Sequence, residues 1–242
     1  MLSPLFDAIR ANPLLLRQKQ PDMIRKLQTQ AANTDAQGTG NKVTDQEASF
    51  ATLLEAHGFV FQPKAAATAA TAATAATAAT AATAPGKYYN YQVNGSQRSI
   101  DFRAFEHDGT AVTRLIDLDL KHTTSDVFFL NDGWFHKDVV YVVTWDRRTS
   151  ALRKKKTTEP ATLIALGQDI PSPEESACME ELLAIKKKYN TEFKGCGSLS
   201  TYIRFANRYK CDRFTPEETE RLYGRILAHA SSSSSSSASP PP

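Results

Sequence analysis

From Ile116 to Lys121 the chain alternates between apolar and charged residues, in the order Ile-Asp-Leu-Asp-Leu-Lys. Successive side chains of a β-strand point to opposite faces of its sheet, so this segment predicts a strand with one apolar and one charged face. The charged face carries Asp117, Asp119 and Lys121. Three charges on one face of a central strand need a chemical reason. A hard divalent cation, which prefers clustered carboxylate oxygens, is one such reason.

The segments around this strand also have β patterns. Asn94-Gly95, a dipeptide typical of tight hairpins, separates two candidate strands, and His107-Asp108-Gly109 forms the next expected turn. A long apolar run later in the chain predicts a strand buried in the centre of the sheet. The expected strands are residues 59–61, 88–93, 98–105, 112–121, 138–145 and 162–166.

Helices are expected before and after these strands. Residues 1–30 are polar and helical in pattern but are interrupted by Pro13 and Pro21. Thr44 or Asp45 caps the next helix and Gly58 ends it. The expected later helices are residues 44–58, 173–189, 199–209 and 216–229, the last capped by Thr215. This order predicts an α+β fold with extra helices at the C-terminus.

Composition suggests the domain organisation. Residues 1–40 form a helical arm and linker, and residues 41–230 form the main domain, whose part 174–230 is helical. An Ala-Ala-Thr repeat at 65–86 has a three-residue period that builds no apolar helix face, so it is expected to be a surface insert. The Ser-rich and Pro-rich residues 231–242 form a disordered tail.

Several classes of protein are excluded. No run of about 18 apolar residues is present, so no membrane span is expected. The N-terminus lacks the basic start and apolar stretch of a secretory signal. Cys178, Cys196 and Cys211 have neither an even number nor a C-x-x-C spacing, which argues against a disulfide framework and a zinc site. We therefore expect a cytoplasmic protein, and without glycine-rich phosphate-binding motifs we expect no nucleotide cofactor.

Another acid, Asp101, precedes the charged strand. Antiparallel pairing through the turn at 107–110 brings Asp101 beside Asp119. Two carboxylates can hold Mg²⁺, which polarises a phosphate and lowers the pKa of bound water. Lys121 can then position or deprotonate that water, or neutralise charge on the phosphate. This set suits hydrolysis of a phosphodiester. The alternative is that Asp119 and Lys121 are pairing charges on an exposed edge strand.

These residues resemble the catalytic motif of the PD-(D/E)XK nuclease superfamily and, within it, the type II restriction endonucleases. The match consists of Ile100-Asp101-Phe102 and Asp119-Leu120-Lys121, and 17 residues separate Asp101 from Asp119. The order of elements between about Thr44 and Gly167 also agrees. Ile100 stands where the motif has its proline. The resemblance implies a nuclease core with a mixed central sheet flanked by helices, a Mg²⁺ cofactor and double-stranded DNA as the substrate.

The resemblance also assigns roles to individual residues. Asp101 and Asp119 would bind the metal, the backbone carbonyl of Leu120 would complete the site, and Lys121 would be the catalytic lysine. Glu47, in the helix before the sheet, fits the additional acid that some members bring from that helix. Asp117 lies outside the motif and is expected to be a supporting or solvated carboxylate.

Basic residues are candidates for contacts with DNA. Residues 147–213 hold 14 Lys and Arg against 8 Asp and Glu, although the whole chain has a net charge of only +3. The candidates for phosphate contacts are Arg147, Arg148, Arg153, Lys154, Lys155 and Lys156. In the expected helix 199–209, Arg204, Asn207 and Arg208 could read base edges in the major groove. Alternatively, this is an ordinary amphipathic helix with solvated arginines.

The sequence therefore predicts a Mg²⁺-dependent, site-specific double-strand DNA endonuclease of a restriction–modification system. A homodimer would match a two-fold protein to a two-fold DNA site. One alternative is a repair or recombination nuclease of the same fold, and another is a catalytically inactive DNA-binding module. A third alternative is a scaffold protein built around the low-complexity segments, but this alternative does not account for the strands.

Overall fold

The structure is a computed structural model, and contacts between its residues divide the chain into two compact units. It describes residues 2–32, 43–62, 84–92, 100–125, 127–131, 133–148, 158–192 and 206–232. The first unit comprises Met1–His122, Val139–Thr144 and Pro160–Ile164. The second comprises Thr123–Asp138, Trp145–Glu159 and Ala165–Pro242.

Three short helices begin the first unit: α1 (Ser3–Ala11), the 3-10 helix η1 (Pro13–Arg17) and α2 (Pro21–Ala32). Pro13 and Pro21 each open a helix, because proline lacks the N–H that a helix interior needs but suits the first turn. The predicted interruptions at these two prolines are confirmed.

Helix α3 (Asp45–Ala56) is the predicted second helix, and Thr44 is its N-cap. The Oγ1 of Thr44 accepts a hydrogen bond of 3.2 Å from the Glu47 N–H, and a carboxylate oxygen of Glu47 accepts one of 2.7 Å from the Thr44 N–H. This capping box satisfies two N–H groups that the start of a helix leaves free. Gly58, whose φ is +83°, follows the helix and allows the turn into β1 (Phe59–Phe61).

β1 is the first strand of a six-stranded sheet with the order β1-β2-β3-β4-β6-β7. β1 and β2 are parallel, whereas β2 and β3, and β3 and β4, are antiparallel. The further strands are β2 (Gly86–Tyr91), β3 (Phe102–His107), β4 (Val112–Thr123), β6 (Val139–Arg148) and β7 (Thr158–Leu166). The predicted α+β class, with a mixed sheet flanked by helices, is confirmed.

The turn between β3 and β4 lies where the sequence predicts it. Oδ1 of Asp108 accepts hydrogen bonds from the Thr110 N–H at 2.8 Å and the Ala111 N–H at 2.9 Å. Gly109 has a φ of +104°, which residues with a Cβ rarely adopt. The turn sets a register in which Phe102 lies opposite Leu118 on the apolar face of the two strands.

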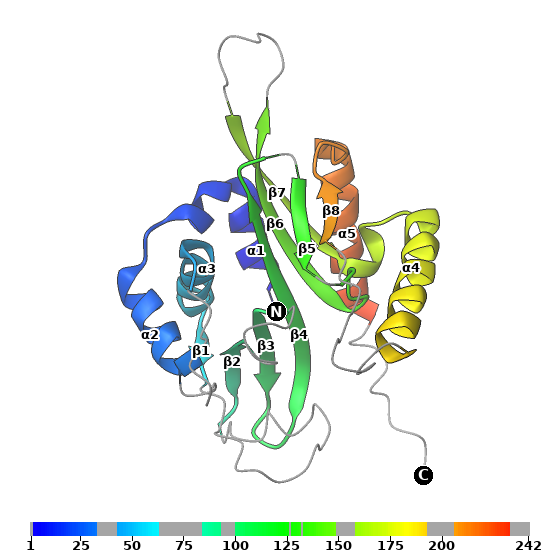
Figure 1. Cartoon of the computed structure of the whole chain (residues 1–242). Coiled ribbons are helices and arrows are strands. Elements are labelled where there is room, and N and C mark those ends of the chain that lie inside the picture. The colour runs from blue at the N-terminus through cyan, green and yellow to red at the C-terminus, as the bar shows by residue number, and fades with distance from the viewer. Residues whose placement is uncertain are drawn as a thin grey trace. The chain divides into compact units, whose positions relative to one another are not determined.

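The core of the first unit lies between α3 and one face of β2 and β3. Phe50 of α3 packs against Phe102 of β3 with 5.2 Å between ring centroids, and Tyr91 of β2 lies 5.2 Å from the same ring. Phe50 and Phe102 are fully buried, and each contributes about 2–3 kcal/mol through burial. Figure 1 shows α3 beside β1 and β2, with α2 next to it. This packing holds the start of α3 and the end of β2 in place.

The second unit contains a separate two-stranded antiparallel sheet of β5 (Val127–Asn131) and β8 (Ala206–Lys210). This unit also contains the short helix η3 (Gly167–Asp169), α4 (Pro173–Glu192) and α5 (Pro216–Ser232), as well as the last residues of β6 and the two ends of β7. The predicted cap of the last helix is confirmed, since Oγ1 of Thr215 accepts a hydrogen bond of 3.2 Å from the Glu218 N–H.

The predicted helix over residues 199–209 is wrong at its C-terminal end, where residues 206–210 form β8. The region 174–230 is therefore not wholly helical. Tyr209 is buried, while the residues on either side of it are exposed, which is the two-residue period of a strand. Its position opposite Phe128 of β5 places the tyrosine in a cluster of aromatic rings in this unit. Residues 199–205 lie outside the described residues.

Other predicted features also lie outside the described residues. These are the Asn94-Gly95 turn, most of the 65–86 insert, the basic residues 153–156 and the tail from residue 233 onward. β2 and β3 nevertheless pair as the hairpin prediction requires. In the described part of the chain, no helix is both long and apolar enough to cross a membrane.

Candidate functional site

Asp101 and Asp119 lie together where β3 begins and β4 approaches its end. The Asp101 N–H donates a hydrogen bond of 3.0 Å to the carbonyl of Leu118, so the pairing of the two strands extends beyond β3. Oδ2 of Asp101 accepts a hydrogen bond of 2.7 Å from the Leu120 N–H. These two contacts attach Asp101 to the strand that carries Asp119, as the antiparallel register predicts.

Lys121 forms an ion pair with Asp119 on the same face of β4. The side chain of Asp119 is only 1% exposed, whereas that of Lys121 is 23% exposed, so the ammonium group reaches from a buried carboxylate toward solvent. Oδ2 of Asp119 is shielded from solvent, and no N–H or O–H group of the described residues donates a hydrogen bond to it. Burying a carboxylate oxygen without a donor is unfavourable, so a proton shared with Asp101 or a bound cation would stabilise Asp119.

The environment of the two acids disfavours their charged forms. Burial, together with the charge of Asp119, raises the pKa of Asp101 to about 7. Burial also raises the pKa of Asp119, against the opposing effect of Lys121. The two adjacent carboxylates, one fully buried and one half-buried, carry more negative charge than a single lysine compensates. A bound dication would reverse this effect and favour ionisation of both acids.

Glu47 lies near the same two acids, at the start of α3. Its carboxylate is held by Thr44 in the capping box and accepts a hydrogen bond of 2.9 Å from the hydroxyl of Tyr91. Burial and the negative charge of Asp101 raise the pKa of Glu47. In the described ranges, however, no three His, Cys, Asp or Glu side chains form a metal-binding group. Asp101 and Asp119 are thus the part of the site that could hold a cation, and Glu47 lies at its edge.

Tyr91 and Gln92 connect Glu47 to Asp101 from the end of β2. Nε2 of Gln92 donates a hydrogen bond of 2.9 Å to the Tyr91 hydroxyl, and the Gln92 N–H donates one of 2.7 Å to the carbonyl of Asp101. Gln92 is buried and has a φ of +48°, an uncommon conformation for a residue with a side chain. Such backbone strain persists only where the surrounding contacts hold it, as these do.

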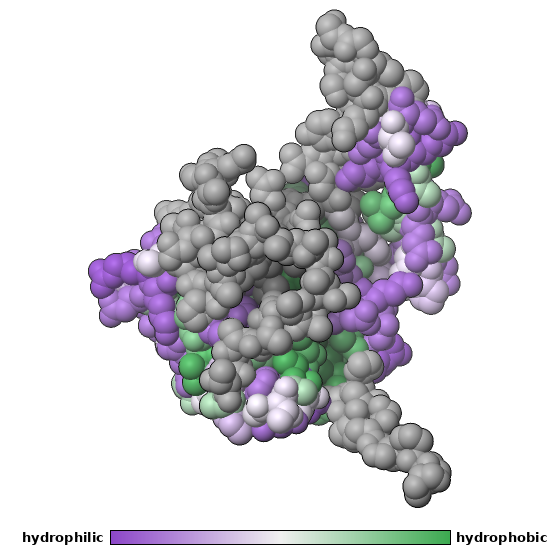
Figure 2. Space-filling model, turned by 90° about the horizontal axis from the view of Figure 1, so that it is seen from below, coloured by the Kyte–Doolittle hydropathy of each residue, from purple (hydrophilic) through white to green (hydrophobic). Residues whose placement is uncertain are grey.

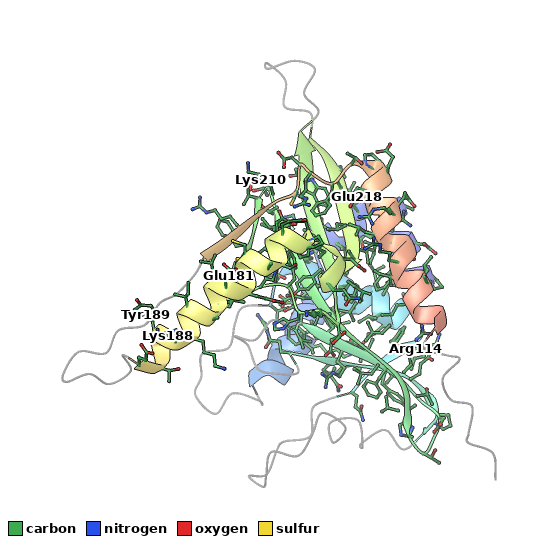
Figure 3. All side chains as sticks on the ribbon, turned by 90° about the vertical axis from the view of Figure 1, so that its right-hand side faces the viewer. Arg114, Glu181, Lys188, Tyr189, Lys210 and Glu218 are labelled. Atoms are coloured by element: carbon green, nitrogen blue, oxygen red, sulfur yellow. The ribbon has the colours of Figure 1, made fainter. Side chains whose placement is uncertain are left out.

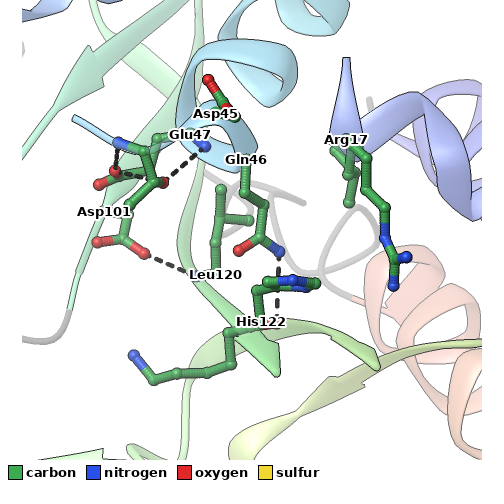
Figure 4. A pocket seen from close by; sticks show the side chains of 10 residues that line it. Arg17, Asp45, Gln46, Glu47, Asp101, Leu120 and His122 are labelled. Atoms are coloured by element: carbon green, nitrogen blue, oxygen red, sulfur yellow. Dashed lines mark hydrogen bonds between the residues drawn. The ribbon is translucent and has the colours of Figure 1, made fainter. Parts of the chain in front are cut away.

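An open cleft of about 780 Å³ adjoins Asp101 and Glu47, while the buried Asp119 lies behind the residues that line it. Figure 4 shows Asp101 and Glu47 on one side of it, Arg17 on the other, and Gln46 and His122 between them. The lining residues are Leu16, Arg17, Thr44, Asp45, Gln46, Glu47, Asp101, Leu120, Lys121 and His122. The cleft therefore exposes both acidic and basic groups to an incoming molecule.

Gln46 holds the end of β4 against α3 inside this cleft. Its Nε2 donates to the Lys121 carbonyl at 3.3 Å and to Oγ1 of Thr144 at 3.2 Å. The same Oγ1 shares a hydrogen bond of 3.0 Å with Nδ1 of His122. These contacts restrain the backbone on either side of the Lys121 side chain.

Asp117, the third charge on this face of β4, has its own partner. Arg103, directly opposite on β3, donates two hydrogen bonds to its carboxylate, at 2.6 and 2.8 Å. The side chains of Arg103 and Asp117 are 10% and 17% exposed. Because the bidentate pair neutralises Asp117, this acid does not add to the uncompensated charge at Asp101 and Asp119.

The predicted DNA-contacting residues are only partly described. Arg147 and Arg148 end β6, and Lys154, Lys155, Lys156 and Arg204 lie outside the described residues. Asn207 and Arg208 belong to β8, so the prediction that they lie on a helix is wrong. Arg208 is exposed, and its guanidinium lies 5.4 Å from the centre of the Phe129 ring.

Sequence reasoning did not find Arg17, Gln46, Tyr91 or Gln92. Gln46 and Tyr91 are ordinary polar and aromatic residues of a helix and a strand, and neither belongs to a motif. The one local signal was the position of Gln46 beside Glu47 in the first turn of α3.

Comparisons with protein-family models, with curated proteins and with solved structures find no match to this chain.

Proposed function

We propose that this chain is a Mg²⁺-dependent endonuclease that cuts double-stranded DNA at specific sites, with the catalytic core of the PD-(D/E)XK superfamily. The observation that carries the proposal is that the fully buried Asp119 and the half-buried Asp101 lie beside Lys121, and that Asp101 and Lys121 line an open cleft. This combination brings the three motif residues together from two strands, as the family resemblance requires.

Mg²⁺ would be held by Asp101, Asp119 and the backbone carbonyl of Leu120. This ion commonly binds proteins through one or two carboxylates and keeps water and phosphate oxygens as its other ligands, so a third protein acid is unnecessary. The unpartnered Oδ2 of Asp119 and the raised pKa of Asp101 support a cation at this position. When bound, the ion would polarise the scissile phosphate and acidify a water molecule.

Lys121 would act on the reacting groups from the edge of the cleft. Its ammonium group can donate a hydrogen bond to the attacking water or to a phosphate oxygen, where negative charge develops. The water oxygen forms a bond to phosphorus while one P–O ester bond breaks. The water loses a proton and the leaving oxygen gains one. Asp119 orients the lysine through their ion pair.

Basic side chains would bind the DNA backbone. Arg17 lines the same cleft as Lys121, and the predicted basic segment 147–156 would add further phosphate contacts. In the second unit, the exposed pair of Arg208 and Phe129 offers a cation and an aromatic face for phosphates or bases.

The decisive experiment incubates the purified chain with long unmodified duplex DNA, with Mg²⁺ and with EDTA. We expect discrete fragments with Mg²⁺ alone. Asp119→Asn should lower the cleavage rate by about a thousandfold, because it removes roughly 4 kcal/mol of charge stabilisation from the transition state. Circular dichroism should show that this variant is folded. Asp22→Asn, an exposed acid on α2, is the matched control and should cut at the normal rate.

Other outcomes would redirect the proposal. A smear of fragments would indicate a nuclease of the same fold without site specificity, such as a repair enzyme. Intact DNA that is shifted on a gel would indicate a catalytically inactive DNA-binding module. Cleavage that Asp119→Asn leaves unchanged would remove the proposed site from the reaction.

A further inference from the structure

Helix α4 carries a row of exposed apolar side chains along one side. Leu182, Ile185 and Tyr189 are 38%, 48% and 44% exposed, and Cys178 is also exposed. The four residues follow one another at intervals of four, three and four, so they lie within about 60° of one another around the helix. In Figure 2, small hydrophobic patches lie among hydrophilic surface at the right, where α4 lies. We call these four residues the α4 row.

A neighbouring side of α4, about a quarter turn from the α4 row, packs into its own unit. Met179 is buried, and Glu175, at the start of the helix, accepts hydrogen bonds of 2.7 and 2.8 Å from Arg213. The α4 row is therefore not the side of the helix that packs into the core of this unit. A row of apolar residues on the outer side of a helix is typical of a surface that contacts another helix.

The charges of α4 are divided between its two halves. The N-terminal half is acidic, with Glu174, Glu175, Glu180 and Glu181, and the C-terminal half has a net positive charge, with Lys186, Lys187 and Lys188 against Glu192. Figure 3 shows Glu181 near the middle of the helix, and Lys188 and Tyr189 toward its C-terminal end. An antiparallel copy of the same helix would place the basic half of each against the acidic half of the other.

The α4 row is also symmetric about its own centre. Leu182 and Ile185 are equally distant from the midpoint, and so are Cys178 and Tyr189. In an antiparallel pair, Leu182 of one copy would therefore meet Ile185 of the other, and Cys178 would meet Tyr189. Glu181 and Lys188 lie on the same flank of the row, where same-flank residues of antiparallel helices meet.

We propose that the α4 row is the interface through which two copies of this chain associate about a two-fold axis. The apolar residues form the seam, and Glu181 of each copy pairs with Lys188 of the other, twice by symmetry. The acidic half of α4 would repel nucleic acid. A protein surface of uniform charge would complement the charge of only one half of α4. The inference depends on α4 alone and not on the proposed nuclease activity. A single pair of helices gives an interface at the low end of specific sizes, so the dimer should be weak and dependent on concentration.

The test measures the mass of the full chain by analytical ultracentrifugation, from about 1 to about 200 μM. We expect a monomer–dimer equilibrium in this range. Glu181→Lys and Lys188→Glu should each weaken association by about tenfold, because each creates two contacts between like charges. The double variant Glu181→Lys/Lys188→Glu should restore the affinity, since it exchanges the charges and keeps them complementary.

Lys210→Glu is the control, because it makes the same charge change on an exposed residue of β8. It should leave the affinity unchanged. The replaced side chains are exposed, so circular dichroism should report a folded chain in every case. A chain that stays monomeric at the highest concentration would overturn the proposal. So would a dimer that neither single variant weakens, or a double variant that does not recover.

Discussion

The hydroxyl of Tyr91 donates a hydrogen bond of 2.9 Å to Oε1 of Glu47. This contact joins the end of β2 to the first turn of α3, and it holds in place the carboxylate that also completes the capping box. Burial and the charge of Glu47 raise the pKa of Tyr91, so the phenol remains a donor across the physiological range. The hydrogen bond between β2 and α3 therefore stabilises the cleft at Asp101, although neither element carries Asp101 or Asp119.

Replacing Tyr91 with phenylalanine should weaken this stabilisation without changing the volume of the core. Loss of a hydrogen bond to a charged group should lower the free energy of unfolding by about 1.5–3 kcal/mol, measured by denaturant titration. If the proposed site is correct, the cleavage rate should fall about tenfold. Tyr88→Phe removes a hydroxyl that donates at 3.0 Å to the Ala84 carbonyl in an exposed position, and it should change neither quantity. Equal effects of the two variants would contradict the stabilising role of the hydrogen bond between Tyr91 and Glu47.

The raised pKa of Asp101 predicts a dependence of stability on pH in the absence of metal. Because its pKa is about 7 in the folded chain against an ordinary 3.8, the folded state binds the proton more tightly than the unfolded state. The resulting stabilisation is complete below about pH 4 and is lost as the pH rises toward 7. Its full size is on the order of 2–4 kcal/mol.

Denaturant titrations in EDTA at several pH values should reveal this loss. Asp101→Asn should reduce the slope of unfolding free energy against pH between about 4 and 7, since asparagine does not titrate. Adding Mg²⁺ at neutral pH should stabilise the wild-type chain and not the variant. Equal slopes for the two chains would show that Asp101 does not carry the raised pKa.

Asp117 should matter for stability and not for the reaction. Asp117→Ala leaves Arg103 nearly buried without its partner, which should lower the free energy of unfolding by about 3 kcal/mol. The double variant Arg103→Met/Asp117→Leu should recover most of that loss, because it removes both charges. Cleavage by the folded double variant should stay near the normal rate. A loss as large as that of Asp119→Asn would place Asp117 in the reaction.

Arg17 should contribute to DNA affinity through a phosphate. Arg17→Gln should weaken binding by about three- to tenfold at moderate salt, to a similar extent for all sequences. The slope of log affinity against log salt should decrease in magnitude by about one. Arg25→Gln, on the exposed side of α2, is the control and should have no effect. If both variants lose affinity for DNA equally, Arg17 does not make a specific contact with the DNA.

The sequence predicted those features that depend on neighbours in the chain. The alternation from Ile116 to Lys121 predicted a strand with its charged face, because the two-residue period is a property of one strand alone. Thr44 and Glu47 are three positions apart, so a helix start could be expected there. Pairing of Asp101 with Asp119 followed from a single tight turn between antiparallel strands, and the register bears this out.

The errors and omissions arose where distant segments decide the outcome. Residues 206–210 form a strand because β5 supplies its hydrogen-bonding partner, and β5 is about 80 residues earlier in the chain. Tyr91 lies 44 residues from Glu47, so no local pattern connects them. The row on α4 was predicted as part of a helix, but only the fold shows which side of that helix remains exposed.

By itself, the sequence determined the α+β class, most of the strands and helices, and the acids and lysine that define the candidate site. These follow from periodicity, capping and turn chemistry, which act over a few residues. Only the tertiary structure decided that Asp119 is fully buried with an unpartnered oxygen, that Asp117 is neutralised by Arg103, and that Glu47 is held by Tyr91. Burial and charge compensation depend on atoms from separate parts of the chain, so they exist only after the strands and helices have packed.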